Sequence, residues 1–115
     1  MSEPGAGWVV THDGIVWNLR KFELPIRIGR SDDVDVVVKQ DTVSRTHALI
    51  DWHDDQYYVS DNDSENGTWA DGIVLISNQD AALSDGSEIM VGTAKLKYFN
   101  DGVNAARYSG SIRNP

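Results

Sequence analysis

Three short polar stretches carry residue types suited to binding an anion. They are Gly29-Arg30, Ser44-Arg45-Thr46-His47 and Ser64-Glu65-Asn66-Gly67-Thr68. An arginine guanidinium presents paired N–H donors to phosphate, while serine hydroxyls and asparagine amides add neutral donors. The second and third stretches each precede a short run that predicts a strand, so both belong to loops. These residue types suit the binding of an anion such as a phosphate, and we expect the three loops to meet at one end of the fold.

The composition is that of a single globular domain. The chain has 115 residues, of which 40% are hydrophobic and 24% charged, enough to bury a core without disulfides or metal. It has no cysteine, which excludes disulfides and thiolate metal sites. No apolar run approaches the roughly 20 residues of a membrane span, and residues 1–7 do not resemble a signal peptide. We expect a monomeric cytoplasmic protein, or a nuclear one in a eukaryote.

The net charge of −8 argues against nucleic acids and anionic membranes as partners, because a nucleic acid is a polyanion and such a membrane has a negatively charged surface. Salt screens charges over about 8 Å, whereas a chain of this size has a radius of gyration of about 13 Å. Distant carboxylates therefore leave room for a locally basic pocket.

Short apolar runs separated by turn residues predict an all-β fold. Asp13-Gly14 and Asp71-Gly72 each lie between two such runs, which is typical of tight hairpins. Another hairpin is predicted between 48–52 and 57–61, with a four-residue loop at 53–56. No segment shows helical periodicity over ten or more residues. We therefore predict an antiparallel-type β-sandwich with the polar loops at one end.

The chain divides into three parts by composition. Residues 8–100 contain the predicted strands and form the domain, and residues 1–7 are an N-terminal extension. After Phe99 the apolar pattern fades into small and polar residues. Residues 101–115 are therefore predicted to be a flexible tail or linker.

Catalysis and transition-metal binding fit the sequence poorly. Ser44 and His47 could act as nucleophile and base, but no Gly-x-Ser-x-Gly elbow surrounds the serine. The pair fits the entry to a strand equally well. The other histidines, His12 and His53, lie on separate segments, which gives no metal-ligand spacing. We expect no enzyme activity, cofactor or metal.

Residues 61–65 invite comparison with a calcium-binding EF-hand loop, since acidic residues alternate there. The sixth position of such a loop would be Asn66 instead of glycine, and the twelfth would be Gly72 instead of glutamate. Flanking helices are not predicted either. A dedicated calcium site is therefore not expected.

The order of the polar motifs closely resembles the forkhead-associated (FHA) domain, a phosphothreonine-recognition module. The resemblance covers Trp8 to Phe99. The motifs that carry it are Gly29-Arg30, Ser44-x-x-His47, Ser64-x-Asn66-Gly67-Thr68, Asp71-Gly72 and Leu83-x-Asp85-Gly86-x-x-Ile89-x-x-Gly92. The resemblance implies an 11-stranded β-sandwich (FHA/SMAD-like) whose binding loops lie at one end.

The resemblance also implies roles for individual ligand-binding residues. Arg30 matches the arginine that contacts the phosphate, and Ser44 matches a serine whose hydroxyl and neighbouring amide bind it. Arg45 stands where a further phosphate or peptide contact is often made. Asn66 matches the asparagine that holds the ligand main chain. Thr42 lies in a loop that influences the residue selected at the third position after the phosphothreonine.

Four residues are implied to support the site. His47 is expected to tie two binding loops together by hydrogen bonding near Thr68. Gly29 looks architectural, and Gly67 permits the turn that presents the neighbouring asparagine.

Glu65 departs from the family pattern, because relatives often carry an uncharged or basic residue there. A carboxylate facing the pocket would repel phosphate. We therefore expect Glu65 to turn outward or to contact a basic ligand residue, with Asp63 adding to an acidic rim.

The sequence thus predicts a phosphothreonine-dependent peptide- or protein-binding module in signalling or complex assembly, with a phosphothreonine-containing protein as partner. The alternative is an FHA-like domain that assembles complexes without phosphorylation. Titration with matched phosphorylated and unphosphorylated peptides separates the two.

Overall fold

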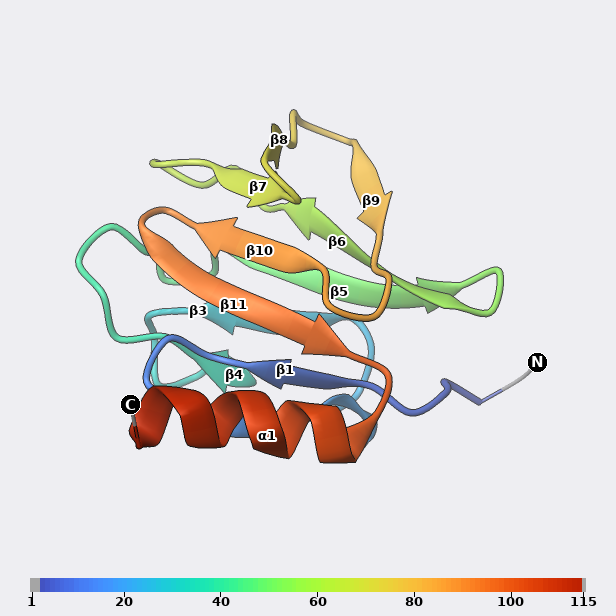
Figure 1. The fold of residues 1–115 in the computed structure, drawn as a ribbon. Helices are drawn as coiled ribbons and strands as arrows, with labels where there is room; N and C mark the ends of the chain where they lie inside the picture. The colour runs from blue at the N-terminus through green and yellow to red at the C-terminus, as the bar shows by residue number, and fades with distance from the viewer. Residues whose placement is uncertain (1–2, 115) are drawn as a thin grey trace.

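A computed structural model describes residues 3–114, which form two packed β-sheets and one α-helix (Figure 1). The six-stranded sheet has the order β2-β1-β11-β10-β7-β8, with β1 Trp8–Val10, β2 Val16–Asn18, β7 Thr68–Ala70, β8 Ile73–Val74, β10 Glu88–Val91 and β11 Ala94–Phe99. The five-stranded sheet has the order β4-β3-β5-β6-β9, with β3 Ile26–Gly29, β4 Val36–Val37, β5 Ala48–His53, β6 Gln56–Asp61 and β9 Asp80–Ala82. A 3-10 helix, Leu19–Lys21, follows β2. The predicted 11-stranded β-sandwich is confirmed.

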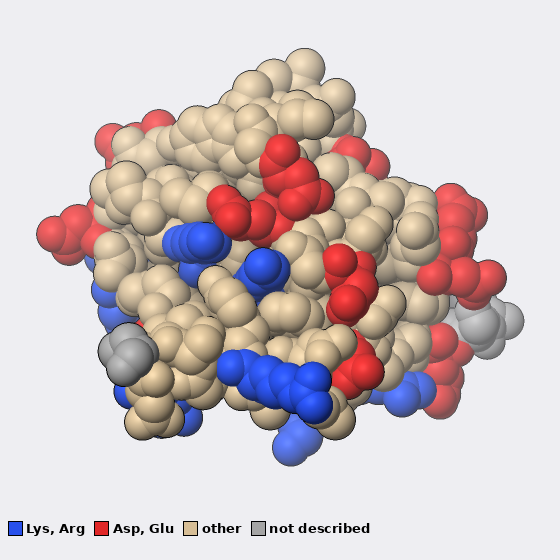
Figure 2. Space-filling view, in the orientation of Figure 1, with Lys and Arg blue, Asp and Glu red and all other residues tan. Residues whose placement is uncertain are grey.

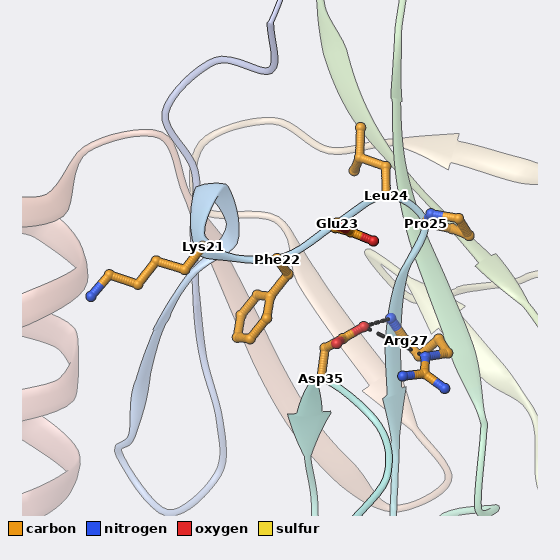
Figure 3. Close-up of a pocket in the computed structure, with 7 residues that line it drawn as sticks. All are labelled: Lys21, Phe22, Glu23, Leu24, Pro25, Arg27 and Asp35. Atoms are coloured by element: carbon orange, nitrogen blue, oxygen red, sulfur yellow. Dashed lines mark hydrogen bonds and ion pairs between the residues drawn. The ribbon is translucent and has the colours of Figure 1, made fainter.

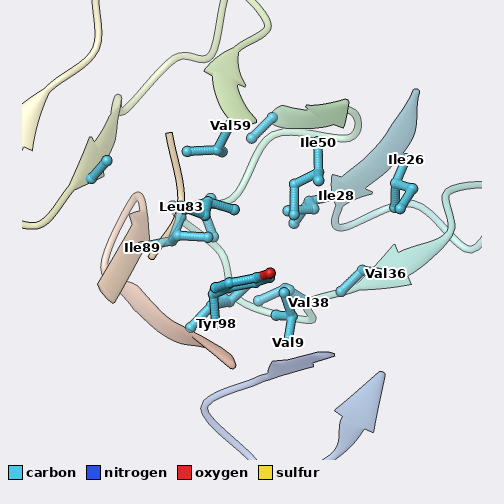
Figure 4. Packing of buried hydrophobic residues seen from close by; sticks show 14 of the residues in the cluster. Val9, Ile26, Ile28, Val36, Val38, Ile50, Val59, Leu83, Ile89 and Tyr98 are labelled. Carbon is cyan, nitrogen blue, oxygen red and sulfur yellow. The ribbon is translucent and has the colours of Figure 1, made fainter. Parts of the chain in front are cut away.

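The core lies between the sheets and is built from alternate residues of strands in both of them (Figure 4). Ile26 pairs with Ile50, and Ile50 pairs with Val59, so these side chains share one face of the five-stranded sheet. From the other sheet, Ile89 and Leu96 are paired and also fully buried. Period-two alternation of this kind fixes the strand register, because a one-residue shift would expose every core side chain.

Two of the predicted hairpins are confirmed, and one has a different loop. Asp13-Gly14 joins β1 to β2, and Asp71-Gly72 joins β7 to β8. The predicted four-residue loop at 53–56 is wrong, because His53 pairs with Gln56. The turn is Asp54-Asp55, with φ of 51° and 59°. Aspartate tolerates the left-handed region better than most residues, so two residues suffice.

The prediction of a flexible tail at 101–115 is wrong for most of that segment. Gly102–Arg113 forms α1, which lies along the outer side of the six-stranded sheet (Figure 1). The Asp101 side chain caps the helix by accepting two backbone N–H groups of the first turn. Ala105 and Ser109 are buried, and the Ser109 hydroxyl donates to a backbone carbonyl of the β1–β2 turn. Because the residues that α1 buries are small, the sequence shows no stripe of large apolar residues there, and the helix was not predicted.

A second, smaller apolar cluster lies beneath α1. Its buried members are Val10, Phe99 and Ala105, and the partly buried Trp8 and Tyr108 pack against them. The helix is therefore a packed part of the domain. None of the helices in residues 3–114 has the length and apolar character needed to cross a membrane.

Candidate functional site

Four loops gather at one end of the sandwich, on the left in Figure 1. They are the β3–β4 loop (30–35), the β4–β5 loop (38–47), the β6–β7 loop (62–67) and the β10–β11 turn (92–93). The first three contain the polar stretches identified in the sequence. Folding therefore brings together segments that are 20 to 51 residues apart in the chain, as hydrogen bonds between them show.

The end of β3 is held against the β4–β5 loop by main-chain hydrogen bonds. The Arg30 N–H donates to the Ser44 carbonyl over 3.0 Å, and the Ser31 N–H donates to the Arg45 carbonyl over 3.3 Å. A Cβ atom on Gly29 would collide with the backbone of Arg45. Glycine at this position therefore allows the close approach that sets Arg30 beside Ser44.

The Arg30 side chain is exposed but anchored. Its Nε donates to the Val43 carbonyl over 2.9 Å. Within residues 3–114, its two terminal nitrogens have no hydrogen-bond or ion-pair partner. Nearby Lys39 donates to the Arg30 carbonyl over 2.8 Å and forms an ion pair with Asp32 at 2.7 Å. The Arg30 guanidinium thus keeps both of its terminal nitrogens available to an incoming anion.

His47 joins two of the loops from inside. It is fully buried, its Nδ1 accepts the Ser44 N–H over 2.9 Å, and its Nε2 lies 2.8 Å from the Gly67 carbonyl oxygen. Because Nδ1 is an acceptor, the ring proton is on Nε2, which donates to Gly67. The sequence predicted a bond near Thr68, and the acceptor is the carbonyl of the preceding residue, Gly67. The Thr68 hydroxyl itself donates to Asp61.

The Ser44 hydroxyl forms a second link between the same loops. Its Oγ accepts the backbone N–H of Glu65 over 3.1 Å. The serine proton therefore stays available to donate outward. The Glu65 side chain is exposed and has no hydrogen-bond or ion-pair partner within residues 3–114. Glu65 thus contributes to the loop through its backbone N–H.

Asp61 holds the β6–β7 loop together, a role that was not predicted from the sequence. It accepts the hydroxyl protons of Ser64 and Thr68 and the Ser64 backbone N–H. Burial raises the pKa of Asp61, but these hydrogen bonds outweigh it and bring the pKa below its usual value of 3.8. Gly67 completes the turn with φ of +91°, a conformation that favours glycine. The available signal in the sequence was an aspartate three residues before the Ser64-x-Asn66-Gly67-Thr68 motif.

The Asn66 side-chain amide has a hydrogen-bond partner on the β4–β5 loop. Its Nδ2 donates to the Thr42 carbonyl over 2.8 Å. The Thr42 hydroxyl is turned toward Thr93, with 2.8 Å between the two Oγ1 atoms. Thr93 was not predicted to belong to the site, because its contact with Thr42 joins residues that are 51 positions apart in the chain.

Cavities, possible metal sites and charged patches elsewhere on the described surface were also compared with these loops as candidate sites. A cavity of about 480 Å³ lies beside the β2–β3 connection, and its lining includes the Arg27–Asp35 ion pair, with 3.6 Å between Nε and Oδ2 (Figure 3). Residues 3–114 contain no cluster of three or more metal-ligating side chains. In Figure 2, acidic side chains lie at the right-hand edge, across the middle of the face and at the left-hand edge.

Comparisons with known proteins agree with this architecture. A sequence model of the FHA domain matches residues 26–92. The oxoglutarate dehydrogenase inhibitor of Corynebacterium jeikeium is 38% identical over 72 residues, covering 63% of this chain and 48% of that protein. The FHA domain-containing protein FhaB of Mycobacterium tuberculosis is 41% identical over 68 residues, covering 57% and 44%. The chain thus spans less than half the length of the curated relatives it matches.

Solved structures give the same fold. A structure from a study of phosphothreonine-dependent FHA domain interactions has a TM-score of 0.72 and 26% identity, covering 82% of this chain and 95% of that one. The FhaA FHA domain, solved in complex with an intracellular domain of another protein, has a TM-score of 0.70 and 26% identity, covering 80% and 98%. The family match covers more than half of the chain, and the two solved structures cover 82% and 80% of it. The chain belongs to the FHA domain family.

Proposed function

We propose that this domain is a phosphothreonine-dependent peptide- or protein-binding module that acts in signalling or complex assembly. The observation that carries the proposal is the pairing of donors at the loop end. The free terminal nitrogens of Arg30 lie on the loop that is hydrogen-bonded to Ser44, whose own hydroxyl proton is available. A phosphate of charge about −1.5 to −2 is the ligand best matched to these donors.

Each proposed contact uses a different chemical property. Arg30 donates two parallel hydrogen bonds to phosphate oxygens, because Nε is already occupied and the terminal nitrogens are free. Ser44 adds a hydroxyl donor, and the exposed Arg45 adds a second positive charge. Asn66 accepts a ligand N–H through Oδ1 while its Nδ2 stays on Thr42 or moves to a ligand carbonyl. This role requires no catalytic group, cofactor or metal, and we expect a monomer to perform it.

The relatives support the proposal through their ligands. One of the solved structures with 26% identity comes from work on phosphothreonine-dependent interactions. FHA domains are among the modules that recognise phosphorylated motifs through arginine clusters.

Binding should depend strongly on phosphorylation. Removing the phosphate removes at least two charge-assisted hydrogen bonds, each contributing about 1.5–3 kcal/mol. A phosphothreonine peptide selected from an oriented library should therefore bind about 100-fold tighter than its unphosphorylated counterpart in calorimetric titration. Equal affinity for the two peptides would favour the alternative, a domain that assembles complexes without phosphorylation.

We also propose that the acidic rim made by Asp63 and Glu65 selects ligands with Lys or Arg near the phosphothreonine. Both side chains are exposed at the β6–β7 loop, and neither has an ion-pair partner within residues 3–114. On a phosphopeptide array, Glu65→Gln should lower the preference for basic over acidic flanks about threefold, the size of an exposed charge interaction. Glu23→Gln, an exposed glutamate on the β2–β3 connection, should change nothing. A wild-type preference for acidic flanks would contradict the proposal.

A further inference from the structure

The β10–β11 turn touches both of the loops that carry the proposed ligand-binding residues. The Gly92 N–H donates to the Gly67 carbonyl over 2.9 Å, which attaches the turn to the β6–β7 loop. The Thr93 N–H donates to the Thr42 hydroxyl oxygen over 3.0 Å, which attaches it to the β4–β5 loop. The fit is tight, since a Cβ atom on Gly92 would lie 2.5 Å from the Thr42 carbonyl oxygen. The turn is therefore a third wall of the site.

A chain of hydrogen bonds leads from this turn to Asn66. The Oγ1 atoms of Thr93 and Thr42 are 2.8 Å apart, and the Thr42 carbonyl accepts from Asn66 Nδ2 over 2.8 Å. Thr42 is thus held through its side chain on one side and holds Asn66 through its backbone on the other. Fixing Thr42 fixes the direction of the carbonyl that receives the Asn66 amide.

This arrangement leaves the Asn66 amide in one orientation before any ligand arrives. With Nδ2 on the Thr42 carbonyl, Oδ1 has no partner within residues 3–114 and can accept a hydrogen bond from a ligand main chain. Asn66 is exposed, so without this anchor its side chain would sample several rotamers. Ordering a side chain in advance removes part of the entropy cost of binding.

We propose that Thr93 is a positioning residue for ligand recognition, acting through Thr42 to orient Asn66. The inference rests on the proposed function, in which Asn66 binds the main chain beside the phosphothreonine. The role belongs to the Thr93 hydroxyl and not to the turn as a whole. Both backbone bonds of the turn, from Gly92 and from the Thr93 N–H, remain when the hydroxyl is removed.

The test compares Thr93→Val, which replaces the hydroxyl with a methyl group, with Thr93→Ser, which keeps it. Thr93→Val should weaken binding of a phosphothreonine peptide about fivefold, the effect of one neutral hydrogen bond, and Thr93→Ser should bind like the wild type. The matched control is Ser111→Ala, which removes an exposed hydroxyl bonded to the Tyr108 carbonyl on α1. It should leave affinity unchanged, and its melting temperature should match that of Thr93→Val.

A double-mutant cycle separates positioning from general stability. Asn66→Ala removes the group that Thr93 positions, so adding Thr93→Val to it should cause no further loss of affinity. Additive losses, or an unchanged affinity for Thr93→Val alone, would overturn the proposal.

A second measurement needs no ligand. In the free protein, the side-chain amide NMR signals of Asn66 should show one hydrogen-bonded proton, and Thr93→Val should shift and average them while Ser111→Ala leaves them unchanged. If Thr93→Val leaves these signals unchanged, Thr93 does not position Asn66. If no phosphothreonine peptide binds the wild type, the proposed function fails, and the amide signals still decide whether Thr93 orients Asn66.

Discussion

Replacing Arg30 with alanine is expected to lower the affinity for a phosphothreonine peptide about 30-fold or more. A hydrogen bond to a charged group contributes about 1.5–3 kcal/mol, and about 1.4 kcal/mol corresponds to a tenfold change in affinity. The guanidinium presents two free terminal nitrogens, because its Nε is already anchored on the Val43 carbonyl. That anchor also limits the conformational freedom that the side chain would lose on binding. Calorimetric titration of wild type and variant measures the effect.

Two further variants make the Arg30 result specific. Arg30→Lys keeps the charge but lacks the planar fork, so it should recover only part of the lost affinity. Arg107→Ala removes an exposed arginine from α1, away from the loops, and should bind like the wild type. Folding should survive in Arg30→Ala, because the hydrogen bond to Ser44 is made by the backbone N–H. Wild-type affinity in Arg30→Ala would show that the pocket lies elsewhere.

The parts of the fold that the sequence predicted well are those encoded by neighbouring residues. Asp13-Gly14 and Asp71-Gly72 predicted their hairpins because these residues accept the dihedral angles of tight turns. The loop at 53–56 was predicted too long, since two aspartates adopt a positive φ there without a glycine. Turn chemistry is local, so errors of this kind are small.

The helix α1 was missed for a different reason. A helix is usually recognised by large apolar residues on one face, but α1 buries Ala105 and Ser109. The groups that receive it lie far away in the chain, on β1 and on the β1–β2 turn. Only the folded sheet shows that this small-residue face fits against it.

The candidate site likewise has some features that the local sequence predicts and others that depend on contacts between distant segments. The motifs located Arg30, Ser44 and Asn66, because the resemblance preserved their order along the chain. The resemblance could not show that Asp61 fastens the β6–β7 loop or that Thr93 bonds to Thr42, 51 residues away. These contacts depend on how the loops pack together.

Replacing His47 with alanine is expected to reduce both folding stability and ligand affinity. The imidazole is fully buried and bonds the Ser44 N–H and the Gly67 carbonyl. Alanine would leave the Ser44 N–H without its acceptor, would remove one of the two donors to the Gly67 carbonyl, and would open a cavity. Losing two hydrogen bonds and the packed ring should cost about 3 kcal/mol. For a domain of this size, a loss of that kind lowers the melting temperature by roughly 10 °C or more. Thermal unfolding measures the first effect and calorimetric titration the second.

A combined loss of folding stability and ligand affinity distinguishes the His47 substitution from the Arg30 substitution. The His47 ring holds the loops that carry Ser44 and Asn66 but has no exposed surface for a ligand, so affinity should fall about tenfold through loop displacement. Arg30→Ala should lower affinity with little change in melting temperature, since its side chain is exposed. His53→Ala, which removes an exposed histidine from the end of β5, should preserve phosphopeptide affinity. If His47→Ala kept the wild-type melting temperature and still lost binding, His47 would have to contact the ligand directly, and the loop-bridging role would be wrong.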